Sequence, residues 1–143
     1  MQVLDFISKI VIENFVKKGE VNMVKIFETK VTAVGMEADS MIDNANMLIL
    51  FGEGAPADLA EFCYTIDNKS LSGAIHEGSI LSINQIDYKV TSIGSVVETN
   101  LKNLGHITIA FDGSTEGSLP GTLHVEGQEL PRITEGSMIA LYS

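Results

Sequence analysis

Leu71–Ile83 reads LSGAIHEGSILSI and places a histidine between two glycines, just before an apolar run. Its second part, EGSIL at Glu77–Leu81, returns as EGSMI at Glu135–Ile139, and its first part, LSGAIH, returns as LPGTLH at Leu119–His124. The two phrases recur in the same order, which indicates an internal duplication.

Two earlier pairs of phrases extend this repeat. They are Lys30–Gly35 (KVTAVG) with Lys89–Gly94 (KVTSIG), and Leu48–Gly54 (LILFGEG) with Thr108–Ser114 (TIAFDGS). The halves then run over about 25–83 and 84–143, and we expect them to superpose over most of their strands. This alignment predicts a helix-containing insertion between Gly54 and Ser70, and it gives His76 and His124 matching positions, from which they could approach one another.

Most of the chain has the rhythm of β structure. From Val24 onward, runs rich in Val, Ile and Thr are broken every eight to twelve residues by glycine or Asn/Asp clusters, which is typical of a small barrel or sandwich. The expected strands are 24–34, 46–52, 62–66, 79–83, 87–93, 105–111, 121–125 and 137–142. Helical spacing predicts two short caps, 57–62 and 96–104. The sequence therefore favours a mainly β domain, a small closed β-barrel with pseudo-two-fold symmetry, because closure removes exposed strand edges.

The first 22 residues have a different pattern. Apolar residues recur at helical spacing through Val3–Lys18, which predicts an amphipathic helix, and Gly19 stands where a helix stop is expected. We expect an N-terminal helical extension over 1–22 and the β-barrel domain over 23–143. If the extension is translated in the native protein, its apolar face must be covered by the barrel or by a second copy, which makes a homodimer a candidate. Met23 is the alternative start, and the mass of the protein from its native gene distinguishes the two.

Charge and composition exclude several classes of protein. The formal net charge of -10 repels phosphate backbones, so no nucleic-acid partner is expected. The longest apolar run, Met47–Phe51, is too short to cross a bilayer, so no membrane insertion is expected. The single cysteine, Cys63, excludes an intramolecular disulfide framework and suits the reducing cytoplasm.

The three histidines are the first candidates for chemistry, because a neutral imidazole nitrogen is a competent nucleophile near neutral pH. His76 and His124 lie between glycines, whose backbone can approach an anion closely, and His106 opens a strand. The competing interpretation is that each is an ordinary hydrogen-bonded strand residue. No HxH or HExxH spacing points to a metal, and Cys63, between Phe62 and Tyr64, is expected to be buried and inert.

Longer phrases resemble a known family. They are FGEGAPADLAEFC at Phe51–Cys63, GAIHEG at Gly73–Gly78, VTSIGSVVETNLKNLGHITIAFDG at Val90–Gly113 and LPGTLHVEG at Leu119–Gly127. Together they resemble the glucitol/sorbitol-specific IIA component of the bacterial phosphotransferase system, over about residues 23–143. The family fold is a β-barrel capped by a helix.

The resemblance implies a cytoplasmic phosphocarrier. Such a protein takes a phosphoryl group from the phosphohistidine of HPr onto its own histidine, and passes it to a cysteine of the IIB component for uptake of the sugar alcohol. No cofactor or metal is implied. Some relatives carry a further histidine just after the phrase matching Glu61–Tyr64, a position sometimes taken as the phosphorylated one, whereas this chain reads Thr65, Ile66, Asp67, Asn68 there. The active role is therefore carried onto the remaining three.

We expect His76 to accept the phosphoryl group, with His124 and His106 as supports. His76 has glycine on both sides to leave backbone N–H groups free, while His106 opens an apolar strand with less room. Glu77 would point to the opposite face if both residues lay on a strand. The alternatives are a regulatory or scaffold barrel without phosphotransfer, and a small-ligand or metal-binding barrel.

Overall fold

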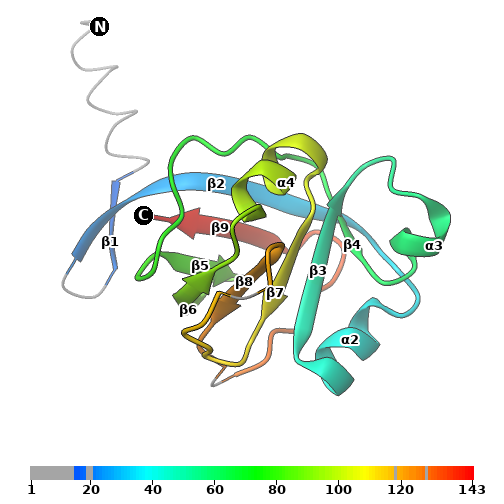
Figure 1. Cartoon of the computed structure of the whole chain (residues 1–143). Helices are drawn as coiled ribbons and strands as arrows, with labels where there is room; N and C mark the ends of the chain where they lie inside the picture. Colours follow the sequence, from blue (N-terminus) through cyan, green and yellow to red (C-terminus); the bar gives the residue numbers. More distant parts are fainter. Residues whose placement is uncertain (1–14, 19–20, 118, 128) are drawn as a thin grey trace, which may run out of the picture.

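The computed structural model describes residues 15–18, 21–117, 119–127 and 129–143. Nine strands and three helices are assigned in these ranges (Figure 1). The strands are β1 Phe15–Lys18, β2 Val21–Val34, β3 Met47–Gly52, β4 Tyr64–Ile66, β5 Ile80–Ile83, β6 Ile86–Ile93, β7 Ile107–Ala110, β8 Thr122–Val125 and β9 Met138–Tyr142. The helices are α2 Ala38–Ala45, α3 Ala57–Ala60 and α4 Val97–Leu104. The prediction of a mainly β domain is confirmed, as are all eight predicted strands and both predicted cap helices.

The strands form one sheet whose pairing returns to an earlier strand. Their order is β1-β2-β4-β3-β7-β8-β6-β5-β9, and β9 also pairs with β2. The pairs β3–β4 and β7–β8 are parallel, while β2–β4 and β6–β8 are antiparallel. Figure 1 shows the long, curved β2 running across the back of the molecule, with α2 and α3 at the end opposite β1.

The pairing registers repeat between the halves. Val31 pairs with Ile66 and Val34 with Tyr64, just as Val90 pairs with Val125 and Ile93 with Leu123. A bulge follows Val31 in β2 and Val90 in β6. Thus β2, α2, β3, β4 and β5 correspond in order to β6, α4, β7, β8 and β9, which agrees with the predicted duplication.

Apolar side chains on alternate strand residues build the core. The fully buried members include Leu48, Leu50, Tyr64, Ile66, Leu81, Ile83, Tyr88, Ile107, Ile109 and Leu123. The helices add equivalent side chains from the two halves, since α2 contributes Ala38 and Ile42 and α4 contributes Val97 and Leu101. The internal repeat thus extends from the backbone into the packing.

The helix α2 was missed by the sequence analysis, because its Asn and Asp residues read as a loop. It ends at Asn46, which has a left-handed φ of 54°, as α4 ends at Gly105 with φ 67°. Asp39 accepts a hydrogen bond from the Tyr64 hydroxyl. Burial and this bond raise the pKa of Tyr64. The repeat could have predicted this helix, because Met36–Asn46 follows KVTAVG just as Ser95–Gly105, which contains the predicted helix, follows KVTSIG.

The predicted N-terminal helix is wrong where it can be compared with the structure. Residues 1–14 and 19–20 lie outside the described part, but Phe15–Lys18 form β1 instead of a helix end. They pair antiparallel with β2, with Phe15 opposite Val24 and Lys18 opposite Val21. Lys18 also lies 4.4 Å from the ring centre of Tyr142 and 3.2 Å from a carboxylate oxygen of Asp87. Strand pairing and these contacts replace the helical hydrogen bonds expected at residues 15–18.

Two details of the predicted repeat are also wrong. Registers align Leu48 with Ile107, one residue before the predicted match at Thr108. They also align β4 directly with β8, so the stretch between Gly54 and Ser70 holds α3 but no excess length. The similarity of LSGAIH to LPGTLH produced the false insertion, because these phrases occupy different places in the two halves.

Candidate functional site

His76 lies in an exposed turn directly before β5. Its Nδ1 atom is 3.0 Å from the carbonyl oxygen of Glu77, and its Nε2 atom is 2.7 Å from Oγ of Ser143. A carbonyl oxygen can only accept, so Nδ1 carries the proton and donates it. In the neutral ring Nε2 then holds the free lone pair, which accepts the hydrogen bond from the Ser143 hydroxyl. A neutral imidazole nitrogen with a free lone pair is a competent nucleophile.

The turn around His76 is held by neighbouring polar groups. The N–H of His76 donates to Oγ of Ser79 at 3.0 Å, and the N–H of Gly78 donates to the carbonyl of Val90 at 2.9 Å. Gly78 has φ 94°, a conformation that favours glycine. From the first turn of α4, Glu98 accepts the N–H of Ile75 at 2.8 Å. The N–H groups of Ile75, His76 and Gly78 are therefore all used within the fold, which corrects the expectation that glycine leaves backbone N–H groups free on both sides of the ring.

Glu77 lies differently from the sequence-based expectation. It belongs to the turn and not to a strand, so strand alternation does not decide where its side chain points. Its carbonyl, rather than its carboxylate, contacts the imidazole. The peptide group of Glu77 therefore sets the tautomer of His76.

His124 lies on β8 and is only 4% exposed. Its Nδ1 atom is 2.9 Å from Oδ1 of Asp112, and its Nε2 atom is buried without a hydrogen-bond partner among the described residues. Desolvation raises the pKa of Asp112, but hydrogen bonds from Ser114 and His124 outweigh it, so the pKa lies below its ordinary value. His124 thus joins the strand to the loop that follows β7, and it is closed to a protein partner in this arrangement.

His106 lies directly before β7, beside an open apolar pocket of about 360 Å³. The pocket is lined by Met41, Ile49, Phe51, Leu59, Phe62, Cys63, His106 and Thr108. The ring centres of His106 and Phe51 are 4.8 Å apart. Burial lowers the pKa of His106 and so favours the neutral ring. His106 has more room than the sequence analysis expected, but no polar contact of its ring is found in the described part of the chain.

The prediction that His76 and His124 occupy matching positions is wrong. Through the strand registers His124 corresponds to Thr65, and through the turns with Gly78 and Gly136 His76 corresponds to Thr134. The N–H groups of His76 and Thr134 make the same bond, to Ser79 and Ser137 respectively. Among the described residues no hydrogen bond joins one histidine to another. The structure therefore leaves three separate environments, of which that of His76 is exposed and polar.

Three residues at the His76 turn were missed by the sequence analysis, namely Ser79, Glu98 and Ser143. Ser79 is part of the repeated EGS phrase, and its counterpart Ser137 caps the equivalent turn. That repetition was a usable signal for Ser79. Nothing in the sequence pattern brings Ser143 to His76 or Glu98 to Ile75, because both contacts are made across the fold.

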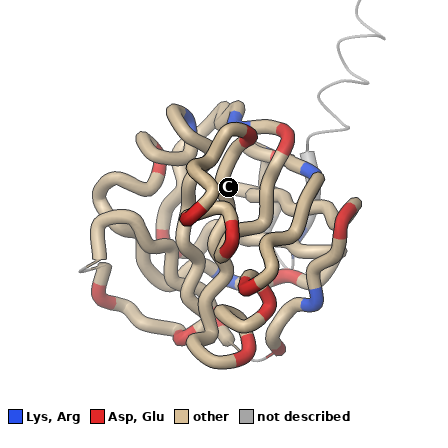
Figure 2. The backbone as a smooth tube through the Cα atoms, turned by 90° about the vertical axis from the view of Figure 1, so that its right-hand side faces the viewer, with Lys and Arg blue, Asp and Glu red and all other residues tan. Residues whose placement is uncertain are grey.

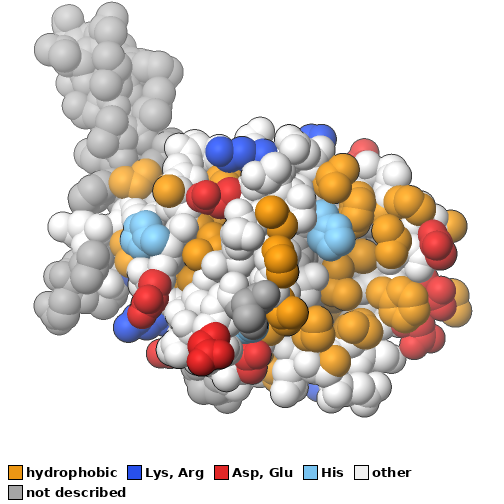
Figure 3. Space-filling view, viewed as in Figure 1, with side chains coloured by type: hydrophobic (Ala, Val, Ile, Leu, Met, Phe, Trp, Pro, Cys, Tyr) orange, Lys and Arg blue, Asp and Glu red, His pale blue; other side chains and the backbone are white. Residues whose placement is uncertain are grey.

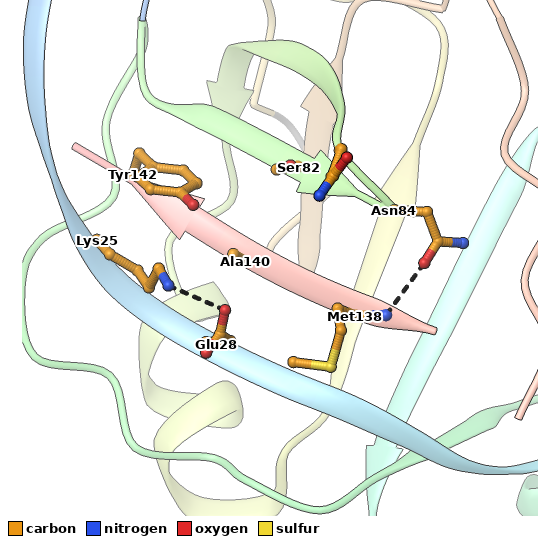
Figure 4. A pocket seen from close by; sticks show the side chains of 8 residues that line it. Lys25, Glu28, Ser82, Asn84, Met138, Ala140 and Tyr142 are labelled. Carbon is orange, nitrogen blue, oxygen red and sulfur yellow. Dashed lines mark hydrogen bonds and ion pairs between the residues drawn. The ribbon is translucent and has the colours of Figure 1, made fainter. Parts of the chain in front are cut away.

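The surface separates into regions of different character. Along the backbone tube in Figure 2, acidic positions are more common than basic ones, as the net charge of -10 leads one to expect. Figure 3 shows apolar side chains gathered around β3 and α2, where the pocket beside His106 lies. A separate groove of about 510 Å³ lies over β2, β9 and β5, and Figure 4 shows Lys25 and Glu28 paired on one side of it. No histidine lines that groove.

Cys63 is buried, as predicted, and its Sγ lies 3.1 Å from the carbonyl oxygen of Leu59. Burial raises the pKa of its thiol, which disfavours the thiolate. No group of three or more His, Cys, Asp or Glu side chains in the described ranges is arranged to hold a metal ion. Among the same residues, no helix is both long and apolar enough to cross a membrane.

Comparisons with known proteins agree with the resemblance in the sequence. The family model described as "PTS system glucitol/sorbitol-specific IIA component" matches residues 26–140. The chain is 45% identical over 122 residues to an Escherichia coli (strain K12) protein named "PTS system glucitol/sorbitol-specific EIIA component", covering 85% of this chain and 98% of that protein. A Shigella flexneri protein of the same name is 44% identical over 121 residues, with the same coverage.

A solved structure is similar as well. The crystal structure of a PTS system IIA component from Enterococcus faecalis V583 superposes with a TM-score of 0.70 at 28% identity, covering 79% of this chain and 97% of that one. The family model and the similar relatives each span most of the chain, including the turn that carries His76. The chain belongs to the family of glucitol/sorbitol-specific IIA components of the phosphotransferase system.

Proposed function

We propose that this protein is a phosphocarrier whose His76 accepts a phosphoryl group from the phosphohistidine of HPr and passes it to the IIB component. The observation that carries this assignment is the pair of hydrogen bonds on the His76 ring, with Glu77 at Nδ1 and Ser143 at Nε2. They select the neutral tautomer with the nucleophilic lone pair on the nitrogen that faces the serine hydroxyl. Family membership supplies the substrate class, sorbitol (glucitol) entering through the membrane components.

The transfer needs little from the protein beyond position and charge. The Nε2 lone pair attacks phosphorus while the P–N bond of the donor phosphohistidine breaks, and its electron pair returns to the donor ring. The proton on Nδ1 stays on the hydrogen bond to Glu77 and stabilises the phosphorylated ring. In the second half-reaction a thiolate of the IIB component attacks phosphorus, and the Nε2 pair returns to His76.

The other two histidines serve as supports in this proposal. His124 holds the loop after β7 through Asp112 and does not touch the phosphoryl group. His106 contributes its stacked ring to the apolar pocket beside β3. Both roles are compatible with residual phosphotransfer after substitution.

The architecture proposed with this function is a small closed barrel with a pseudo-two-fold axis. It is supported by the ladder that returns from β9 to β2 and by the matched registers of the two halves. We place the protein in the cytoplasm, where HPr is found. We assign the phosphocarrier to residues 23–143 and treat 1–22 as an addition to it, since the family model begins at residue 26.

The test is phosphorylation by phosphoenolpyruvate, enzyme I and HPr, read by intact mass. The wild-type protein should gain one acid-labile phosphoryl group, and His76→Ala should gain none while keeping its circular dichroism spectrum. His106→Ala and His124→Ala are the matched histidine controls, and both should still be modified, the second more slowly because a buried hydrogen bond is lost. Full modification of His76→Ala would move the acceptor role to another histidine. No modification of the wild type would favour a regulatory barrel instead.

A further inference from the structure

A closed circuit of hydrogen bonds connects His76 to itself through two serines. The backbone N–H of His76 donates to Oγ of Ser79 at 3.0 Å, the Ser79 hydroxyl donates to Oγ of Ser143 at 3.3 Å, and the Ser143 hydroxyl lies 2.7 Å from Nε2 of His76. Each hydroxyl has one proton to donate, so the direction is set along the whole circuit. With Nδ1 donating to Glu77, the circuit in the neutral ring ends with Ser143 donating to Nε2.

We propose that Ser143 is a catalytic residue of the phosphocarrier, whose hydroxyl holds the Nε2 lone pair in the resting protein and moves onto a phosphoryl oxygen during transfer. This inference rests on the proposed function of His76. When the N–P bond forms, the lone pair is used and can no longer accept the Ser143 proton. The hydroxyl is then free to donate to an oxygen attached to phosphorus, next to the nitrogen it has released, where negative charge must be stabilised.

The position of Ser143 is fixed by the sheet. Its N–H donates to the carbonyl of Val24 at 2.9 Å, and its own carbonyl accepts the N–H of Val24 at 3.0 Å, so it continues the pairing of β9 with β2. Figure 1 accordingly shows the C-terminus beside β2. A donor on a paired strand loses little freedom on binding the transferring group, which favours catalysis by preorganisation.

Ser79 supports this donor from the interior. Its side chain is fully buried, and its hydroxyl bonds to Ser143. In the equivalent turn of the other half, Ser137 accepts from the N–H of Thr134 and from the side-chain amide of Asn84, and within the described residues no hydrogen bond joins it to a histidine. Ser79 and Ser137 thus make the same turn hydrogen bond, but only Ser79 also bonds to Ser143. A comparison of variants at the two positions therefore distinguishes the support of Ser143 from the turn bond itself.

The test compares Ser143→Ala, Ser143→Thr, Ser79→Ala and Ser137→Ala in the full chain. Ser143→Ala should accept phosphate from phosphorylated HPr about tenfold more slowly, the loss expected for one donor hydrogen bond. Ser143→Thr keeps the hydroxyl and should restore most of the rate. Ser79→Ala should lose more rate than Ser137→Ala, although both lose the same turn bond. Wild-type rates in Ser143→Ala, no rescue by threonine, or equal losses in Ser79→Ala and Ser137→Ala would overturn the proposal.

A second readout does not depend on transfer. The ¹⁵N resonances of the unphosphorylated wild type should show Nδ1 protonated and Nε2 as a hydrogen-bonded acceptor, and in Ser143→Ala the Nε2 resonance should move toward that of an unbonded ring nitrogen. An unchanged Nε2 resonance would overturn the hydrogen bond itself. If His76→Ala is still phosphorylated, the assignments of His76 as acceptor and of Ser143 as its donor are both wrong. If His76→Ala is not phosphorylated but Ser143→Ala reacts at the wild-type rate, only the role of Ser143 is wrong.

Discussion

Gly35 and Gly94 make the same close approach to backbone at equivalent points of the two halves. A Cβ on Gly35 would lie 2.2 Å from the carbonyl oxygen of Ala60, and a Cβ on Gly94 would lie 2.2 Å from those of Leu119 and Pro120. Their N–H groups also bond alike, to the carbonyls of Cys63 and Thr122 at 2.9 Å. Each glycine therefore marks where the end of a long strand crosses the segment that enters β4 or β8.

This close approach predicts that Gly35→Ala and Gly94→Ala are both strongly destabilising. The backbone must shift to admit a methyl group, so each should lower the free energy of unfolding by about 2–3 kcal/mol in urea titrations. Gly121→Ala is the matched control. Its nearest contact would be the Asn100 amide at 3.8 Å, so we expect a change within about 0.5 kcal/mol. A large difference between Gly35→Ala and Gly94→Ala would contradict their structural equivalence.

The lowered pKa of Asp112 predicts that this residue stabilises the fold at neutral pH and that this stabilisation is lost in acid. A carboxyl group whose pKa is lower in the folded state stabilises the fold above its ordinary pKa of 3.8, and the contribution disappears as pH falls through the lowered value. Asp112→Asn should therefore lose stability at pH 7 and show a shallower decline below about pH 4. The loss should stay below about 1 kcal/mol, because the Asp112 side chain is 47% exposed. An unchanged acid profile would contradict a structural role for the Asp112–His124 pair, and Asp58→Asn on α3 is the control.

The pKa of His106 is also lowered in the folded protein. Protonation makes His106 positive, whereas it makes Asp112 neutral, but in both cases the stability of the fold decreases as pH falls. Burial disfavours the protonated ring, so the unfolded chain binds more protons and the fold loses stability as pH falls below the ordinary histidine pKa of 6.5. The loss is complete once pH has passed below the folded value. His106→Gln should therefore reduce the drop in thermal midpoint between pH 7 and pH 5. An equal drop in the variant and the wild type would rule out His106 as its source.

Because β1 lies at the edge of the sheet, we expect residues 1–22 to contribute little to the stability of the described domain. Among the described strands β1 pairs only with β2, and its Lys18 contacts Asp87 and Tyr142 at the surface. A chain beginning at Met23 should unfold cooperatively and lose less than about 2 kcal/mol, since an exposed ion pair contributes little. Lys18→Ala in the full chain isolates the side-chain share. Loss of cooperative unfolding would show that the domain needs its N-terminal segment.

The alternation of apolar residues and the glycine spacing were sufficient to predict eight of the nine described strands and two of the three described helices. They were also sufficient for the duplication, because KVTAVG and KVTSIG lie on equivalent strands. The helix α2 escaped because its stability comes from packing Ala38 and Ile42 on the core more than from strong local helix signals. Phe15–Lys18 were assigned to a helix because apolar residues recur there every three or four positions. That local spacing does not show that β2 is available as a strand partner.

What the sequence determined by itself was the class of fold, the family and the three histidines, since these depend on residue types and their local order. What only the tertiary structure decided was which histidine is exposed with a hydrogen-bond partner at each ring nitrogen. LSGAIH and LPGTLH share letters, but strand register places His124 in the interior against Asp112, and His76 in an open turn. The hydrogen bond from Ser143 to His76 joins residues far apart in the chain, so it arises from the closing of β9 on β2 and β5 and could not be read from any local pattern.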